Sequence, residues 1–116
     1  MLTIYTSHNC ISSKRAQKWL EQHGIAYVEK RIFVDDISEN DIKSMLKFSE
    51  NGFTDIISER SIVYSENKEL IKDMKVKELI EFINEYPTIL KRPIIVDETT
   101  ELLLTGFNRF DIEELI

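Results

Sequence analysis

The sequence predicts an α/β domain in which a run of helices is inserted between two parts of one mixed β-sheet. A strand, a helix and a second strand fit within the first 34 residues, and such a unit pairs its strands in parallel through a right-handed crossover. The last third of the chain holds two short apolar runs separated by a turn, followed by residues that can cap a helix, which favours a hairpin and a terminal helix.

The first part of the sheet is predicted from residues 2–34. Residues 2–6 are rich in β-forming side chains and are followed by the polar turn 7–9. A helix is expected from Ile11 to about His23, where Gly24 stands at the position of a C-terminal cap. The second strand is expected over residues 27–34. Its buried face is predicted to hold Val28, Ile32 and Val34.

The middle of the chain is predicted to be helical. Ser38 followed by Asp41 is a weaker form of the capping box, and the helix that it starts is expected to end at Asn51-Gly52. Residues 54–74 indicate short helices, and residues 76–86 form the clearest amphipathic helix, directly before a proline. The aromatic residues interpreted as helix packing are Trp19, Phe82 and Tyr86.

Pro93 is expected to open a third strand over residues 94–97, and a turn leads into its hairpin partner at residues 102–104. Asp111 and Glu114 are interpreted as a capping pair for a last helix. The resulting order, βαβ, helices, then ββα, is that of a thioredoxin-like fold with a helical insertion. We therefore expect a single domain whose thioredoxin-like part comprises residues 1–36 and 87–116 and whose insertion comprises residues 37–86.

Composition excludes several classes of protein. The chain has 116 residues, 42% of them apolar and 31% charged, which is typical of a soluble globular domain. No apolar run approaches the ~20 residues of a membrane span, and no signal peptide is evident. A single cysteine excludes an internal disulfide and a cysteine-built metal cluster, which makes a reducing cytoplasm the expected compartment. We also expect no metal and no cofactor. The net charge of −6 argues against autonomous nucleic-acid binding.

Cys10 is the first candidate for chemistry, because it lies in a strand-to-helix loop just before a helix N-terminus, where unpaired amides and the helix dipole stabilise a thiolate. Taken alone, a single cysteine is more commonly a small buried side chain. Ser13 occupies the second position of a C-x-x-C pair, which leaves Cys10 as a monothiol open to mixed-disulfide or sulfenate chemistry, or as a vestigial thiol. His8 is either an activator of this thiol or an exposed loop histidine.

Arg92 and Pro93 form the second signal. In thioredoxin-like folds a proline before this strand is commonly cis and faces the cysteine loop, although by itself Pro93 would be interpreted as the start of an edge strand. Taken alone, Arg92 would likewise be interpreted as a solvated charge. Arg60 is either an anion-binding guanidinium or an ordinary surface residue, and the sequence does not separate the two interpretations.

Five fragments, in their order and spacing, together resemble the Spx branch of the arsenate reductase-like family over nearly the whole chain. The resemblance implies a thioredoxin-like domain with a helical insertion, and a cytoplasmic regulator of transcription in a stress response. The matching fragments are Tyr5-Thr6-Ser7 before Cys10, Trp19-Leu20-Glu21 after it, the run from Asp55 to Ser61, the run from Lys91 to Asp97, and Gly106-Phe107-Asn108.

The resemblance also implies a partner, the C-terminal domain of the RNA polymerase α subunit. Gly52 falls where the family has the glycine needed for that contact, and close backbone approach or a positive φ would explain a glycine there; the end of a helix alone would explain it as well. The chain departs from the C-x-x-C switch found in many members. It also stops at Ile116, short of the tail through which such regulators are delivered to a protease system.

The competing interpretation is an arsenate reductase or a related glutaredoxin-coupled thiol reductase, a branch that uses a single cysteine in a C-x-x-S setting like that of Cys10 and Ser13. Arg60 and Arg92 match two of its three oxyanion-binding arginines, and Phe107 stands where the third is expected. The missing charge-assisted contact is worth roughly 1.5–3 kcal/mol, which favours the regulator. A thioredoxin-fold adaptor with another partner is a third interpretation.

Overall fold

The sheet of the protein, seen in a computed structural model that describes residues 1–116, has four strands in the order β2-β1-β3-β4. The strands β1 and β2 run parallel, whereas β1 pairs antiparallel with β3 and β3 antiparallel with β4. This arrangement confirms the predicted βαβ and ββα units. The strands are β1 (Leu2–Thr6), β2 (Val28–Arg31), β3 (Ile94–Asp97) and β4 (Leu102–Thr105).

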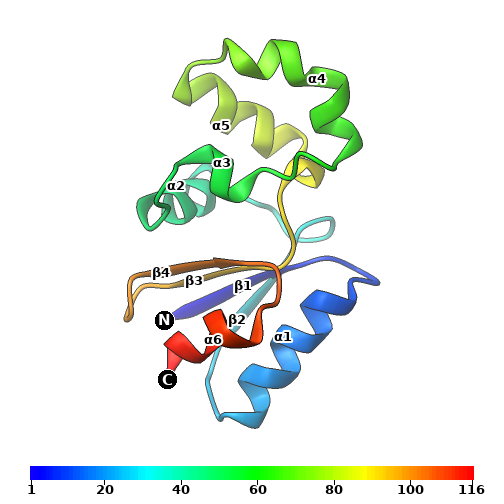
Figure 1. The fold of residues 1–116 in the computed structure, drawn as a ribbon. Coiled ribbons are helices and arrows are strands. Elements are labelled where there is room, and N and C mark those ends of the chain that lie inside the picture. The colour runs from blue at the N-terminus through cyan, green and yellow to red at the C-terminus, as the bar shows by residue number, and fades with distance from the viewer.

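Helices cover both faces of the sheet (Figure 1). The helix α1 and the short C-terminal helices α6 and η2 lie on one face, and the helices inserted between β2 and β3 lie over the other. No helix has both the length and the apolar character that crossing a membrane requires. The bounds are α1 (Ile11–Gln22), α2 (Glu39–Lys47), α3 (Phe53–Ile56), α4 (Ile62–Lys72), α5 (Val76–Glu85), η1 (Pro87–Ile89), α6 (Arg109–Ile112) and η2 (Glu113–Leu115).

Two hydrophobic clusters form because side chains alternate between the faces of a strand. Ile95 of β3 points into the cluster beneath the sheet, whereas its neighbours Ile94 and Val96 point into the cluster shared with the insertion. We call the first the α1 cluster. Its buried members are Leu2, Ile4, Ala16, Trp19, Leu20, Ile95 and Ile112.

The second strand is shorter than the sequence predicts. It ends at Arg31, whose carbonyl oxygen accepts the N–H groups of Val34 and Asp35 at 3.1 and 2.8 Å, so the chain turns away from the sheet. Ile32 is buried as expected, but Val28 and Val34 are exposed. The prediction of one shared buried face was therefore wrong.

Several predicted helix ends also differ. The helix α2 ends at Lys47, and Gly52 is instead the N-cap residue of α3. Asn108 caps α6 by accepting backbone N–H groups with its side chain, so Asp111 and Glu114 are not the capping pair. Trp19 is buried, but Tyr86 lies at the end of α5 and is 45% exposed, with its ring against Phe82.

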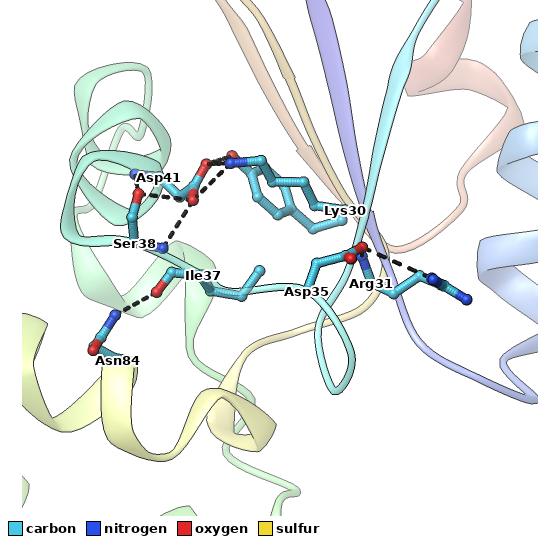
Figure 2. Close-up of polar contacts among 8 residues, drawn as sticks. Lys30, Arg31, Asp35, Ile37, Ser38, Asp41 and Asn84 are labelled. Carbon is cyan, nitrogen blue, oxygen red and sulfur yellow. Dashed lines mark hydrogen bonds and ion pairs between the residues drawn. The ribbon is translucent and has the colours of Figure 1, made fainter.

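A buried polar network joins the insertion to the sheet (Figure 2). Ser38 and Asp41 form a full capping box at the start of α2, as predicted. Asp41 also accepts hydrogen bonds from Tyr5 Oη at 2.8 Å and from Lys30 Nζ at 2.8 and 3.0 Å. Asp41 is thus a buried link between β1, β2 and α2, a role that goes beyond the helix cap that the sequence predicts.

Candidate functional site

Cys10 is the N-cap residue of α1, and its Sγ accepts the N–H of Ser13 at 3.4 Å. Cys10 thus lies at the helix N-terminus, as the sequence predicts. Its thiol is half-buried. Ser13 is buried, and its Oγ accepts the N–H of Ser7 at 3.4 Å, which ties the loop before α1 to the helix. The serine at the second position of the C-x-x-S pattern thus contributes to the loop's structure.

The peptide bond between Arg92 and Pro93 is cis, as expected. Cys10 and Arg92 line one open cavity of about 430 Å³. The guanidinium of Arg92 donates a hydrogen bond to Ser7 Oγ at 3.4 Å and lies 5.6 Å from the centre of the Phe33 ring. The cavity combines a thiol with two cationic side chains, an arrangement that can hold an anion beside the sulfur. The other lining residues are Ser58, Leu90, Lys91, Thr105 and Gly106.

Arg60 does not line the cavity of Cys10. It is exposed and lines a neighbouring hollow of about 400 Å³, which shares only Ser58 and Lys91 with the Cys10 cavity. His8 is exposed and lines a third cavity, of about 230 Å³, which does not include Cys10. The structure thus brings Cys10 and Arg92 together and leaves the other two candidates outside their cavity.

Phe107 is half-buried and packs against the α1 cluster. An apolar ring therefore occupies the position where the resemblance to the reductase branch led us to expect a third arginine. The backbone before it is fixed to the sheet, because the N–H of Gly106 donates to the carbonyl of Pro93 at 2.8 Å.

Gly52 has φ +66° and ψ −134°, a backbone conformation that favours glycine. The positive φ of Gly52 therefore explains why glycine stands at this position. The alternative explanation from the sequence, that Gly52 ends a helix, is not needed. A Cβ atom built on Gly52 would meet no heavy atom within 4 Å. The space over this residue is open to a partner.

Asp55 holds in place the loop of residues 48–52 between α2 and α3, the Gly52 loop, which is a role that the sequence did not predict. Its Oδ2 accepts the N–H groups of Asn51 at 2.9 Å and Glu50 at 2.8 Å. The hydrogen bond from the Asn51 backbone is the main cause of a lowered pKa for Asp55, supported by the Glu50 backbone and the charge of Lys91. The signal in the sequence that could have indicated this role is the position of the Asp55 carboxylate, three residues after Gly52 and in the first turn of a helix.

Comparison with known proteins identifies relatives along the whole chain. The model of the ArsC family matches residues 5–115. The Global transcriptional regulator Spx of Bacillus subtilis (strain 168) is 40% identical over 116 residues, which is 100% of this chain and 87% of that protein. Global transcriptional regulator Spx 1 of Bacillus cereus is 37% identical with the same coverage.

Solved structures show the same fold. An arsenate reductase from Vibrio cholerae superposes with a TM-score of 0.83 at 20% identity, covering 99% of this chain and 97% of that one. An ArsC family related protein from Bacteroides fragilis gives 0.82 at 23% identity with the same coverage. At these identities the likeness concerns the thioredoxin-like ArsC fold alone, because one fold hosts many functions.

Proposed function

Because this chain belongs to the ArsC family and to its Spx branch, we propose that it is a transcriptional regulator that binds the C-terminal domain of the RNA polymerase α subunit and alters promoter use. The observation that carries the proposal is the full-length match to proteins named global transcriptional regulators. The chain is acidic overall, so an indirect route to promoters, through the polymerase, suits it better than autonomous DNA binding.

The surface around Gly52 is the proposed contact. Its open α-carbon allows a partner's backbone or side chain to approach closely, and Asp55 fixes the loop in one conformation before binding. A loop that is already ordered loses less conformational entropy when it binds. Both features support a rigid docking point at Gly52.

The regulator is proposed to work without a disulfide switch in the chain. Cys10 is its single cysteine, and Ser13 uses its hydroxyl to hold the backbone of Ser7. An internal disulfide therefore cannot toggle binding, and Cys10 is proposed to remain a monothiol.

The test compares Gly52→Arg with Gly52→Ala in binding to the isolated C-terminal domain of the α subunit. Both substitutions place a Cβ on a backbone with positive φ, a strain of order 1–3 kcal/mol, so they should lower the melting temperature alike. Only arginine fills the space in front of the loop. We expect Gly52→Ala to bind within about tenfold of the unmodified protein and Gly52→Arg to lose at least about a hundredfold, roughly 2.7 kcal/mol.

Equal loss of binding in both variants would mean that the backbone conformation matters and the open space does not. Undiminished binding of Gly52→Arg would remove Gly52 from the contact. Absence of binding by the unmodified protein would refute the proposed partner.

A second candidate function is a glutaredoxin-coupled reductase that uses Cys10 as nucleophile. It is favoured by the cavity that places Cys10 with Arg92 and Lys91. In this interpretation Arg60 and Arg92 would bind the oxyanion, but Arg60 lines a different hollow and Phe107 supplies no charge. The regulator is therefore the better-supported function.

A further inference from the structure

The two edges of the sheet differ in chemistry. The edge strand β2 has the sequence Val-Glu-Lys-Arg, and charged side chains of this kind protect an edge from pairing with other chains. The opposite edge strand, β4, has the sequence Leu-Leu-Leu-Thr, with no charged residue and no proline. One edge of the sheet is thus protected by its sequence and the other is not.

The outer hydrogen-bonding groups of β4 can be assigned from its pairing with β3. Gly106 donates to Pro93, and hydrogen-bonded pairs alternate along an antiparallel ladder, so Leu104 and Leu102 also turn their groups toward β3. The N–H and C=O groups of Leu103 and Thr105 therefore point away from the sheet. No backbone hydrogen bond of the turns, loops or caps uses them.

A groove of about 550 Å³ runs beside this edge, and all four residues of β4 line it. Figure 1 shows β4 between the inserted helices and α6. Acidic side chains lie on both walls, with Glu50 and Asp55 on the insertion side and Asp111 and Glu114 on the α6 and η2 side. Phe48, Lys91 and Glu101 complete the lining.

We propose that the edge of β4 binds an extended, lysine- or arginine-rich segment of a partner protein, which adds to the sheet as a fifth strand. Main-chain hydrogen bonds to Leu103 and Thr105 would hold the segment, as in other cases of strand addition. Successive side chains of the added strand point to opposite faces and so meet both acidic walls. Basic residues on both faces of the segment are therefore favoured.

A second copy of this chain is a poorer occupant. Pairing β4 with β4 would bring two sets of the same acidic walls together, on chains that each carry a net charge of −6. Like charges across an interface oppose association. The charge of the groove therefore selects a basic partner.

The test measures amide hydrogen exchange in the full chain with three synthetic peptides. The first, Lys-Lys-Val-Thr-Lys-Lys-Val-Thr, places lysines on both faces of a strand, and the second has glutamate for lysine. The third has proline for the first valine and the first threonine, so that one of the two prolines faces β4 in either register. We expect the first peptide alone to slow exchange at the Leu103 and Thr105 amides, which face outward. The amides of Leu102 and Leu104, already bonded to β3, should change little.

Two variants separate the backbone and charge contributions. Thr105→Pro removes an outward N–H without removing a bond to β3, and should abolish the protection of Leu103. Glu101→Lys with Glu114→Lys should weaken binding of the lysine peptide by about tenfold. Glu66→Lys with Glu69→Lys makes the same charge change on exposed positions of α4, outside the groove, and should weaken it by less than about threefold.

Four results with the peptides and variants would overturn the proposal. The first is equal binding of the lysine and glutamate peptides, and the second is binding of the lysine peptide without protection of the Leu103 and Thr105 amides. The third is an equal loss of affinity for the lysine peptide in the two double variants when both are folded. The fourth is that the proline peptide binds as well as the lysine peptide. Protection that rises with protein concentration in the absence of peptide would assign the edge to self-association and would also overturn it.

Discussion

Replacing Asp41 by asparagine should lower the free energy of unfolding by about 2 kcal/mol at pH 7. The carboxylate accepts hydrogen bonds from three residues, one on β1, one on β2 and one at the N-cap of α2 (Figure 2). Oδ1 accepts from Tyr5 Oη and Lys30 Nζ, and Oδ2 accepts from Lys30 Nζ and from the N–H and Oγ of Ser38. Both oxygens act only as acceptors, which an amide cannot reproduce.

The magnitude follows from what asparagine keeps. Its oxygen can still accept from Ser38, and its NH₂ group can donate to Tyr5 Oη, but the NH₂ group then faces the ammonium of Lys30. The loss is one charge-assisted interaction, worth roughly 1.5–3 kcal/mol. The Lys30 side chain is 35% exposed and can turn to water, so the cost stays below the roughly 3–5 kcal/mol of a fully buried ion pair that loses one partner.

The loss of unfolding free energy caused by Asp41→Asn should become smaller as the pH falls. Burial by itself would raise the pKa of Asp41, but the hydrogen bonds from Lys30, Ser38 and Tyr5 outweigh it and lower the pKa below its ordinary value. A carboxyl with a lowered pKa in the folded state contributes stability above its unfolded pKa, and this contribution is lost as the pH falls through the folded pKa. The difference in unfolding free energy between the unmodified protein and Asp41→Asn should therefore be full at pH 7 and shrink below about pH 4.

Urea unfolding followed by circular dichroism at pH 7 and at acidic pH measures this difference. Glu39→Gln is the matched control, because Glu39 lies on the same helix in an exposed pair with Lys43 at 3.2 Å, and such pairs are worth about 0.5 kcal/mol or less. Equal losses for Asp41→Asn and Glu39→Gln, or a loss at Asp41 that does not vary with pH, would refute the reasoning.

Cys10→Ala should leave binding to the α-subunit domain within about twofold, and a large loss in a folded variant would show that the thiol takes part. The unmodified protein should not catalyse arsenate-dependent oxidation of a glutathione–glutaredoxin system, and turnover around 1 s⁻¹ or more would favour the reductase. Phe107→Arg should lower stability by about 1–3 kcal/mol because a charge replaces an apolar ring; unchanged urea unfolding would contradict its packing role.

The order of elements was predictable because local signals coincide with it. Apolar alternation, the Ser38 and Asp41 capping box and the proline before β3 all act within a few residues. The end of β2 was not predictable in the same way, since it depends on a turn in which one carbonyl, that of Arg31, accepts two N–H groups. Val34 would have continued the strand by its propensity alone.

Two features that the sequence did not predict depend on contacts between distant segments. Asp41 is buried because Tyr5, 36 residues away, and Lys30 of β2 reach it. Arg60 and Arg92 are both cationic in the sequence, but only the structure shows that they line different cavities. Side-chain direction in loops is set by tertiary packing, which spacing along the chain does not contain.

The proposed partner surface and the thiol cavity are separate parts of the molecule. The Gly52 loop is held by Asp55, whereas Cys10 lines a cavity that includes neither residue. Lys91 links the two regions, since it lines the Cys10 cavity and its charge also lowers the pKa of Asp55. A charge interaction between two partly exposed side chains of this kind transmits little energy. Changes at the thiol should therefore reach the Gly52 surface only weakly, and binding at Gly52 should be largely independent of the state of Cys10.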